Sequence, residues 1–186
     1  MSDSGTYVWG GLTWKLLHGL ASLGLRGAAL RRFIEAMGLA LPCDDCRHNL
    51  ERHMGAHAFE WDDGERAVFE LHATVSAEVH PGYEGPSLAV VRRRAGMVDR
   101  HFTATDLVSL MHIIFNVCGA ERGSGYEDAV CEFIEALIEV LARYRPDLAQ
   151  IAKGLRFCHG CLHEKGGHEC ARYMLTLAPP LMVVLS

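Results

Sequence analysis

Apolar residues recur three or four positions apart along most of this chain, the spacing of amphipathic helices. Four such segments fill the first part of the sequence, at residues 9–23, 33–41, 42–54 and 62–79. Pro42 suits the first turn of the third segment, and Asp62 or Asp63 suits the N-cap of the fourth. We therefore expect four helices here, the third beginning with Cys43 and Cys46 in its first turn.

The same periodicity returns later, predicting helices at residues 105–115 and 126–144 around a glycine-rich turn. Residues 87–102 mix β-branched residues with arginines, and either a short strand or an irregular connection suits them. From Phe157 onward, three cysteines and three histidines stand among glycines, which predicts a loop. The patterns predict an all-α fold with two parts, residues 5–100 and 101–186.

Composition narrows the class of protein. The 186 residues are 49% hydrophobic and 22% charged, which is typical of a globular chain. The net charge of -5 argues against nucleic-acid binding. No apolar run is long enough for a membrane span, and the N-terminus lacks the pattern of a signal peptide, so we expect a cytoplasmic protein without membrane association.

Seven cysteines without a signal peptide favour metal or redox chemistry over a secreted disulfide scaffold. Two C-x-x-C pairs stand out, Cys43 with Cys46 and Cys158 with Cys161. At a helix start, the first thiolate of such a pair is stabilised by free backbone N–H groups. This geometry suits a redox pair, and half of a zinc site is the alternative for Cys43 and Cys46.

Aromatic and imidazole side chains accompany the first pair. Trp14 and His18 are one helical turn apart and can share a face, and His72 lies on the inward side of the fourth predicted helix. Alone, the first two would more often be a core tryptophan and a hydrogen-bonded histidine. Together with a C-x-x-C pair, they can line a flat ligand.

These segments resemble the Erv/ALR family of FAD-linked sulfhydryl oxidases. The family pattern W-G-x-x-x-W-x-x-L-H, then P-C-x-x-C, then H-N-x-V-N is similar to residues 9–18, 42–46 and 72–76 of this chain. The similarity covers about residues 7–83. Ala73 and Ser76 stand where the family has asparagines, and Ser76 alone retains a side chain that can form a hydrogen bond.

The resemblance implies a four-helix bundle that cradles FAD within residues 5–100, followed by an additional helical region. Cys43 would exchange with substrate thiols and Cys46 would face the flavin. Electrons would pass through FAD to oxygen and give hydrogen peroxide. The cofactor-binding residues that it implies are Gly10, Thr13, Trp14, His18, His72, Val75, Ser76 and Val79.

Partners and compartment follow from the same resemblance. The expected substrates are thiol-containing proteins, and a homodimer is expected by analogy. Family members occur in several compartments and in large DNA viruses, so host cytoplasm or a virion is the compartment that we infer. The alternative function is a non-catalytic, zinc-stabilised helical interaction protein.

The C-terminal cysteines leave two interpretations open. Cys158, Cys161 and Cys170 with His168 or His163 form a soft ligand set that can bind zinc. The resemblance offers a second interpretation, a mobile dithiol that passes electrons to Cys43 and Cys46. Cys118 and Cys131 flank the turn of a predicted helical hairpin and are either a disulfide or buried thiols.

Overall fold

The computed structural model describes residues 4–82, 84–95, 102–121 and 125–177, and every element within these ranges is a helix. The all-helical prediction is confirmed. The chain divides into two compact units, Met1–Phe102 and Thr103–Ser186. Among the residues described, no helix is both long and apolar enough to cross a membrane.

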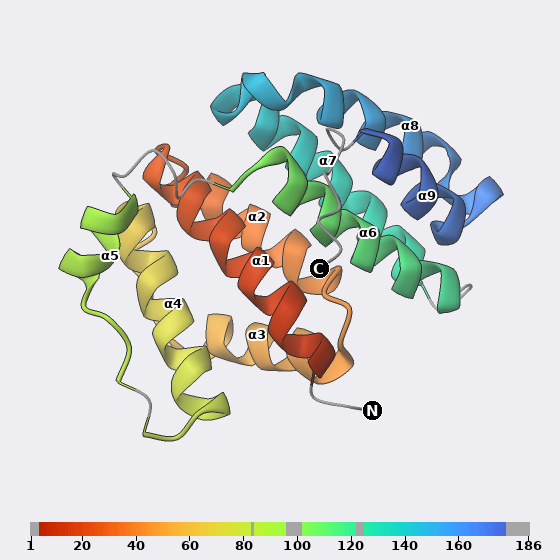
Figure 1. The fold of residues 1–186 in the computed structure, drawn as a ribbon. Helices are drawn as coiled ribbons and strands as arrows, with labels where there is room; N and C mark the ends of the chain where they lie inside the picture. Colours follow the sequence, from red (N-terminus) through yellow and green to blue (C-terminus); the bar gives the residue numbers. More distant parts are fainter. Residues whose placement is uncertain (1–3, 83, 96–101, 122–124, 178–186) are drawn as a thin grey trace, which may run out of the picture. The chain divides into compact units, whose positions relative to one another are not determined.

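The described residues of unit 1 form the four predicted helices and one more (Figure 1). They are α1 (Ser4–Ser22), α2 (Gly27–Leu39), α3 (Asp44–Ala56), α4 (Gly64–Val79) and α5 (Leu88–Ala95). Helix α1 packs against α4, and α3 packs against both α2 and α4. The segment whose structure the sequence left open, residues 87–102, contains α5, which contacts α1 and α4.

The core of unit 1 explains why these segments are helical. Their periodic apolar positions are buried against one another, so each helix hides the face that its sequence pattern defines. Fully buried side chains include Leu16, Leu17, Leu20, Leu30, Phe33, Ile34, Met37, Val68 and Leu71. Asp63 caps α4 by accepting a hydrogen bond from the Arg66 N–H, as its sequence position predicts.

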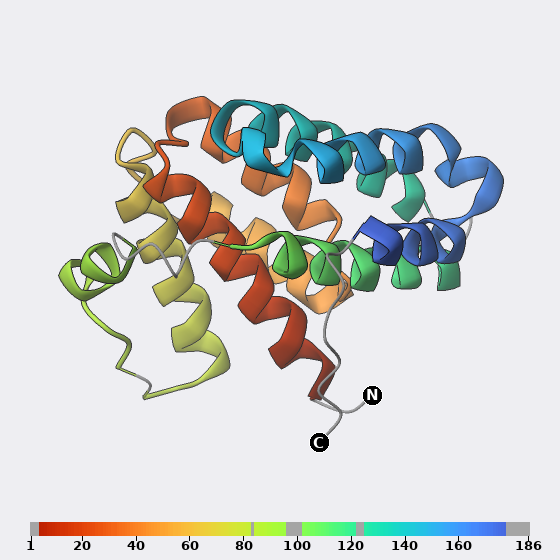
Figure 2. The same ribbon diagram turned by 45° about the horizontal axis from the view of Figure 1, so that its top comes forward.

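Unit 2 consists of α6 (Ala104–Ala120), α7 (Tyr126–Tyr144), a short 3-10 helix (Pro146–Leu148), α8 (Ala149–Lys165) and α9 (Gly167–Leu177). Helix α6 begins earlier than predicted because Thr103 and Asp106 form a capping box. Helix α9 packs on α6 and α8, and α7 packs on α8. Figure 2 shows α8 and α9, in blue, joined by a tight turn.

The predicted loop from Phe157 onward is wrong, because α8 and α9 continue through it. Cys158, Cys161 and Cys170 are buried together with Leu155, Leu162 and Met174. The three cysteines therefore complete apolar helix faces, a role that free cysteine commonly takes. Counting them only as ligands hid the helical periodicity of this segment.

Candidate functional site

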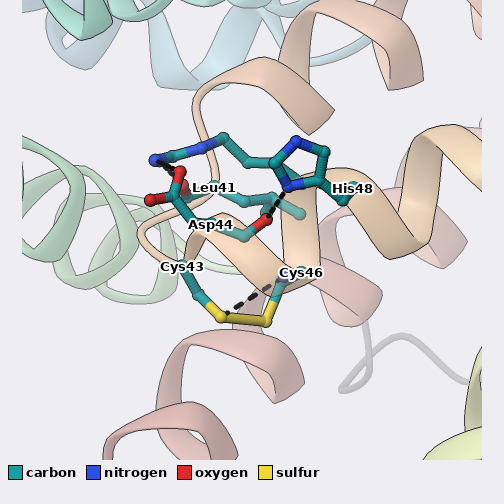
Figure 3. The surroundings of a disulfide bond; sticks show 6 residues. Leu41, Cys43, Asp44, Cys46 and His48 are labelled. Atoms are coloured by element: carbon teal, nitrogen blue, oxygen red, sulfur yellow. Dashed lines mark hydrogen bonds and ion pairs between the residues drawn. A yellow bond between two sulfur atoms is a disulfide. The ribbon is translucent and has the colours of Figure 1, made fainter. Parts of the chain in front are cut away.

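Cys43 and Cys46 form a disulfide at the N-terminus of α3, with Cα atoms 5.2 Å apart. Cys43 is the N-cap residue, and its Sγ accepts a hydrogen bond from the backbone N–H of Cys46 at 3.4 Å. Figure 3 shows both sulfur atoms on one side of the helix start, away from the Asp44 and His48 side chains. Both cysteines are half-buried, so the disulfide is partly open to solvent.

The loop before this disulfide is held by Arg47, a residue that the sequence analysis did not single out. Its Nη1 donates to the Leu41 carbonyl oxygen at 2.6 Å, and its Nη2 forms an ion pair with Asp44. The His48 ring also contacts the Asp44 carbonyl, with 3.0 Å between Nδ1 and oxygen. The available signal was an arginine four positions after Cys43, because a side chain one turn into a helix can reach back to the residues at the helix N-terminus.

Trp14, His18 and His72 come together between α1 and α4. The rings of Trp14 and His72 are stacked, with centroids 4.2 Å apart and planes inclined by 11°. His18 Nε2 lies 3.1 Å from His72 Nδ1, so one imidazole donates and the other accepts. Two segments far apart in sequence thus form one aromatic and imidazole cluster.

The two imidazoles are uncharged at neutral pH. Burial lowers the pKa of His18 to about 4. The pKa of His72 is also lowered to about 4, first by burial and then by the neighbouring His18. A neutral pair can share one hydrogen bond, whereas two imidazolium rings would repel each other at this distance.

The other predicted cofactor residues occupy α1 and α4 with different exposure. Gly10 is half-exposed, and among the described residues no heavy atom outside its own helix lies within 4 Å of the Cβ that another residue would carry there. Thr13 is buried, and its Oγ1 has no hydrogen-bond partner among the described residues. Val75 and Ser76 are half-buried, whereas Val79 is 56% exposed.

These residues could line one side of a flat, uncharged ring with a hydrogen-bonding edge, such as FAD carries. Gly10, Trp14 and His18 follow one another at intervals of four on α1, and the unpartnered Thr13 hydroxyl can donate or accept. One constraint is geometric. Because Trp14 and His72 already stack at 4.2 Å, a ring can lie beside this pair but enters between them only if the two separate.

In unit 2 the cysteines of the predicted zinc set are close together, but the histidine has another partner. Cys161 Sγ lies 4.0 Å from Cys170 Sγ, and Cys158 Sγ contacts the Cys170 carbonyl oxygen at 3.9 Å. His168 is exposed and its Nδ1 lies 3.2 Å from Asn116 Oδ1. Over the residues that the structure describes, no cluster of three or more His, Cys, Asp or Glu could hold a metal ion.

The structure also places the other residues of unit 2 that the sequence singled out, His163, Cys118 and Cys131. His163 is exposed, and its Nε2 lies 3.9 Å from Cys131 Sγ. Cys118 and Cys131 are free thiols on α6 and α7 and do not form a disulfide. Burial raises the pKa of Cys118 to about 12 and that of Cys131 to about 11, which keeps both protonated at neutral pH.

Comparisons with known proteins add no assignment. The sequence matches no family model, and neither the curated proteins nor the solved structures contain a match.

Proposed function

We propose that unit 1 is an FAD-dependent sulfhydryl oxidase that forms disulfides in thiol-containing proteins. The observation that carries the proposal is a partly exposed disulfide at the N-terminus of α3, in the same unit as the Trp14, His18 and His72 cluster. The order of the sequence motifs supports it. Bound FAD would take the electron pair from the reduced Cys43 and Cys46 and deliver it to oxygen, giving hydrogen peroxide.

The protein's own part in the reaction is thiol–disulfide exchange. A substrate thiolate attacks Cys43 Sγ, the Cys43–Cys46 bond breaks, and Cys46 leaves as a thiolate. A second substrate thiolate then attacks the mixed disulfide at the substrate sulfur and releases Cys43. The substrate gains one disulfide and loses two electrons and two protons, while Cys43 and Cys46 become two thiols.

The start of α3 favours this exchange. The Cys43 sulfur accepts the Cys46 N–H, so a developing negative charge on it is stabilised by the backbone and by the helix dipole. Arg47 holds the Leu41 carbonyl and thereby fixes the loop that leads to Cys43. A fixed loop keeps the sulfur atoms in one orientation for an incoming thiolate.

Gly10, Thr13, Trp14, His18, His72, Val75 and Ser76 are the residues that would hold FAD. Trp14 and His72 offer ring faces, and the Thr13 hydroxyl offers a hydrogen bond that it does not use within the described residues. The low pKa of both imidazoles keeps this surface uncharged at neutral pH. A neutral aromatic surface suits stacking of a flat ring.

Two measurements on the full chain test the proposal. After incubation with excess FAD and gel filtration, the protein fraction should show a flavin absorbance band, and it should consume oxygen when a dithiol is added. Cys43→Ser and Cys46→Ser should abolish oxygen consumption and retain FAD, whereas Cys131→Ser should change neither. A folded protein that elutes without flavin would contradict the proposal, as would full turnover by Cys43→Ser.

A further inference from the structure

Three sulfur atoms converge where α8 meets α9. Cys158 and Cys161 lie one turn apart on α8, and Cys170 lies on α9 after the turn at Gly166 and Gly167. Gly166 adopts a φ of 79°, which favours glycine. A Cβ on Gly167 would overlap the Phe115 carbonyl oxygen, so only glycine lets α9 start this close to α6. These contacts fix Cys170 opposite α8.

Cys161 and Cys170 face each other across the two helices, and the Cys158 thiol also lies beside Cys170. The Sγ atoms of Cys161 and Cys170 are 4.0 Å apart and a disulfide requires about 2.05 Å, so bond formation requires the two side chains to rotate toward each other. Cys158 has a different arrangement, since its thiol points to the Cys170 carbonyl oxygen at 3.9 Å. The Cys170 thiol in turn contacts the Cys158 carbonyl oxygen at 3.8 Å.

The three thiols also differ in their exposure to solvent. Cys161 is 8% exposed, whereas Cys158 is 0% and Cys170 is 1% exposed. A reagent from solution therefore reaches Cys161 first. Cys170 can then act on the product without itself being exposed.

The buried surroundings of Cys161 and Cys170 favour an uncharged disulfide over charged thiolates. Burial is the largest cause that raises the pKa of Cys161, and the contact with Cys158, followed by burial, raises that of Cys170 well above its usual range. A bound metal would need these thiols deprotonated. A disulfide carries no charge, so it avoids the desolvation cost that the thiolates would meet here.

We propose that Cys161 and Cys170 are a redox-active pair that forms a disulfide between α8 and α9 when a small disulfide such as oxidised glutathione is present. Cys161 as thiolate attacks one glutathione sulfur and releases one glutathione. Cys170 then gives up its proton, attacks Cys161 Sγ and releases the second glutathione. Two protein thiols are oxidised, one glutathione disulfide is reduced, and the two protons pass to the released thiolates. This pair does not depend on the oxidase activity proposed for unit 1.

The experiment uses the full chain in glutathione buffers from reducing to oxidising. After acid quenching and alkylation, trypsin cleaves at Arg156, Lys165 and Arg172, and the relevant peptides are residues 157–165 and 166–172. A Cys161–Cys170 disulfide joins the two peptides, whereas a Cys158–Cys161 disulfide stays within residues 157–165. Fragmentation at His159 or Gly160 then shows which cysteine of the first peptide carries the link, without any substitution.

We expect the joined peptides to appear as the buffer becomes oxidising, with the link on Cys161, and to disappear after reduction. Cys161→Ala should abolish the link, and the matched Cys158→Ala should retain it. Three outcomes would each overturn the proposal. The peptides could stay unlinked in a glutathione buffer that fully oxidises Cys43–Cys46, or the link could map to Cys158. The third outcome is about one equivalent of bound zinc that shields these thiols from alkylation. Circular dichroism would show that each variant is folded.

Discussion

The indole of Trp14 on α1 stacks on the imidazole of His72 on α4 at a centroid distance of 4.2 Å. The contact joins two helices that the sequence pattern identified separately, and His18 extends it through its 3.1 Å contact with His72. Both imidazoles are partly buried, and this burial is the main cause of their low pKa values. Protonating the cluster therefore opposes folding.

The first prediction is that unit 1 loses stability as the pH falls from 6.5 to about 4. Unfolded imidazoles take up protons near pH 6.5, whereas folded His18 and His72 do so only near pH 4. Within this window the unfolded chain binds more protons, so the free energy of unfolding decreases as the pH decreases. Because both rings are partly exposed, we expect a loss of about 3 kcal/mol for the pair, measured by urea unfolding at several pH values.

Substitutions identify the source of this loss. The double substitution His18→Phe and His72→Phe should flatten the dependence between pH 6.5 and 4, because neither ring can then be protonated. His48→Gln is the matched control, since His48 is exposed on α3. An unchanged slope in the double variant would show that other groups cause the acid sensitivity.

Much of unit 1 could be predicted because its signals are local. Apolar periodicity placed α1 to α4, and the capping position of Asp63 marked the start of α4. Cys43 and Cys46 were predicted at a helix start and lie there as a disulfide. Helix α5 escaped prediction because it has only 8 residues, too few for a helical repeat to be told from a short strand.

What the sequence could not reveal depends on contacts between distant residues. The direct stacking of Trp14 on His72 was not predicted, because the approach of two helices is set by packing along their whole length. In unit 2, a cysteine can be a ligand, a redox group or an apolar residue. Only the burial of Cys158 and Cys170 shows that they fill the space between helices.

The second prediction concerns Gly64 at the start of α4. A Cβ there would overlap the Leu25 carbonyl oxygen and lie 3.2 Å from Arg26 Cβ, so Gly64→Ala should cost about 1–3 kcal/mol. Gly55→Ala is the matched control, because among the described residues no heavy atom outside its own helix approaches within 4 Å. This exposed helical position should become more stable by up to about 1 kcal/mol. Equal effects of the two substitutions, measured by urea unfolding, would refute the close approach at Gly64.

The third prediction concerns the arginine behind the disulfide. The Arg47 side chain is only 17% exposed and bonds the Leu41 carbonyl at 2.6 Å, so Arg47→Ala should cost about 1–2 kcal/mol. Arg31→Ala removes an ion pair with Glu35 in which the arginine is 58% exposed, and it should cost less than about 0.5 kcal/mol. Chemical denaturation measures both.

Arg47→Ala should also change the disulfide that its loop positions. With Leu41 released, the reduction of Cys43–Cys46 by dithiothreitol should become faster, and Arg31→Ala should leave this rate unchanged. A rate that is the same in all three proteins would mean that the loop is held by other contacts.

The fourth prediction separates stability from cofactor binding at Thr13. Its buried hydroxyl has no hydrogen-bond partner among the residues described, and an orphaned group of this kind costs about 1–3 kcal/mol. Thr13→Val keeps the shape of the side chain and removes the hydroxyl. Without FAD, we expect the variant to be more stable than the parent protein by about 1 kcal/mol, measured by urea unfolding.

With FAD, the same substitution should have the opposite consequence. If the Thr13 hydroxyl bonds the cofactor, its loss should weaken FAD binding about fivefold, the equivalent of one hydrogen bond of about 1 kcal/mol, measured by fluorescence titration. Thr74→Val is the matched control on α4, because the Thr74 hydroxyl already bonds the Glu70 and Leu71 carbonyls at 3.1 and 2.8 Å. It should leave FAD affinity unchanged and give no gain in stability. A Thr13→Val protein that binds FAD as tightly as the parent would place the cofactor away from this side of α1.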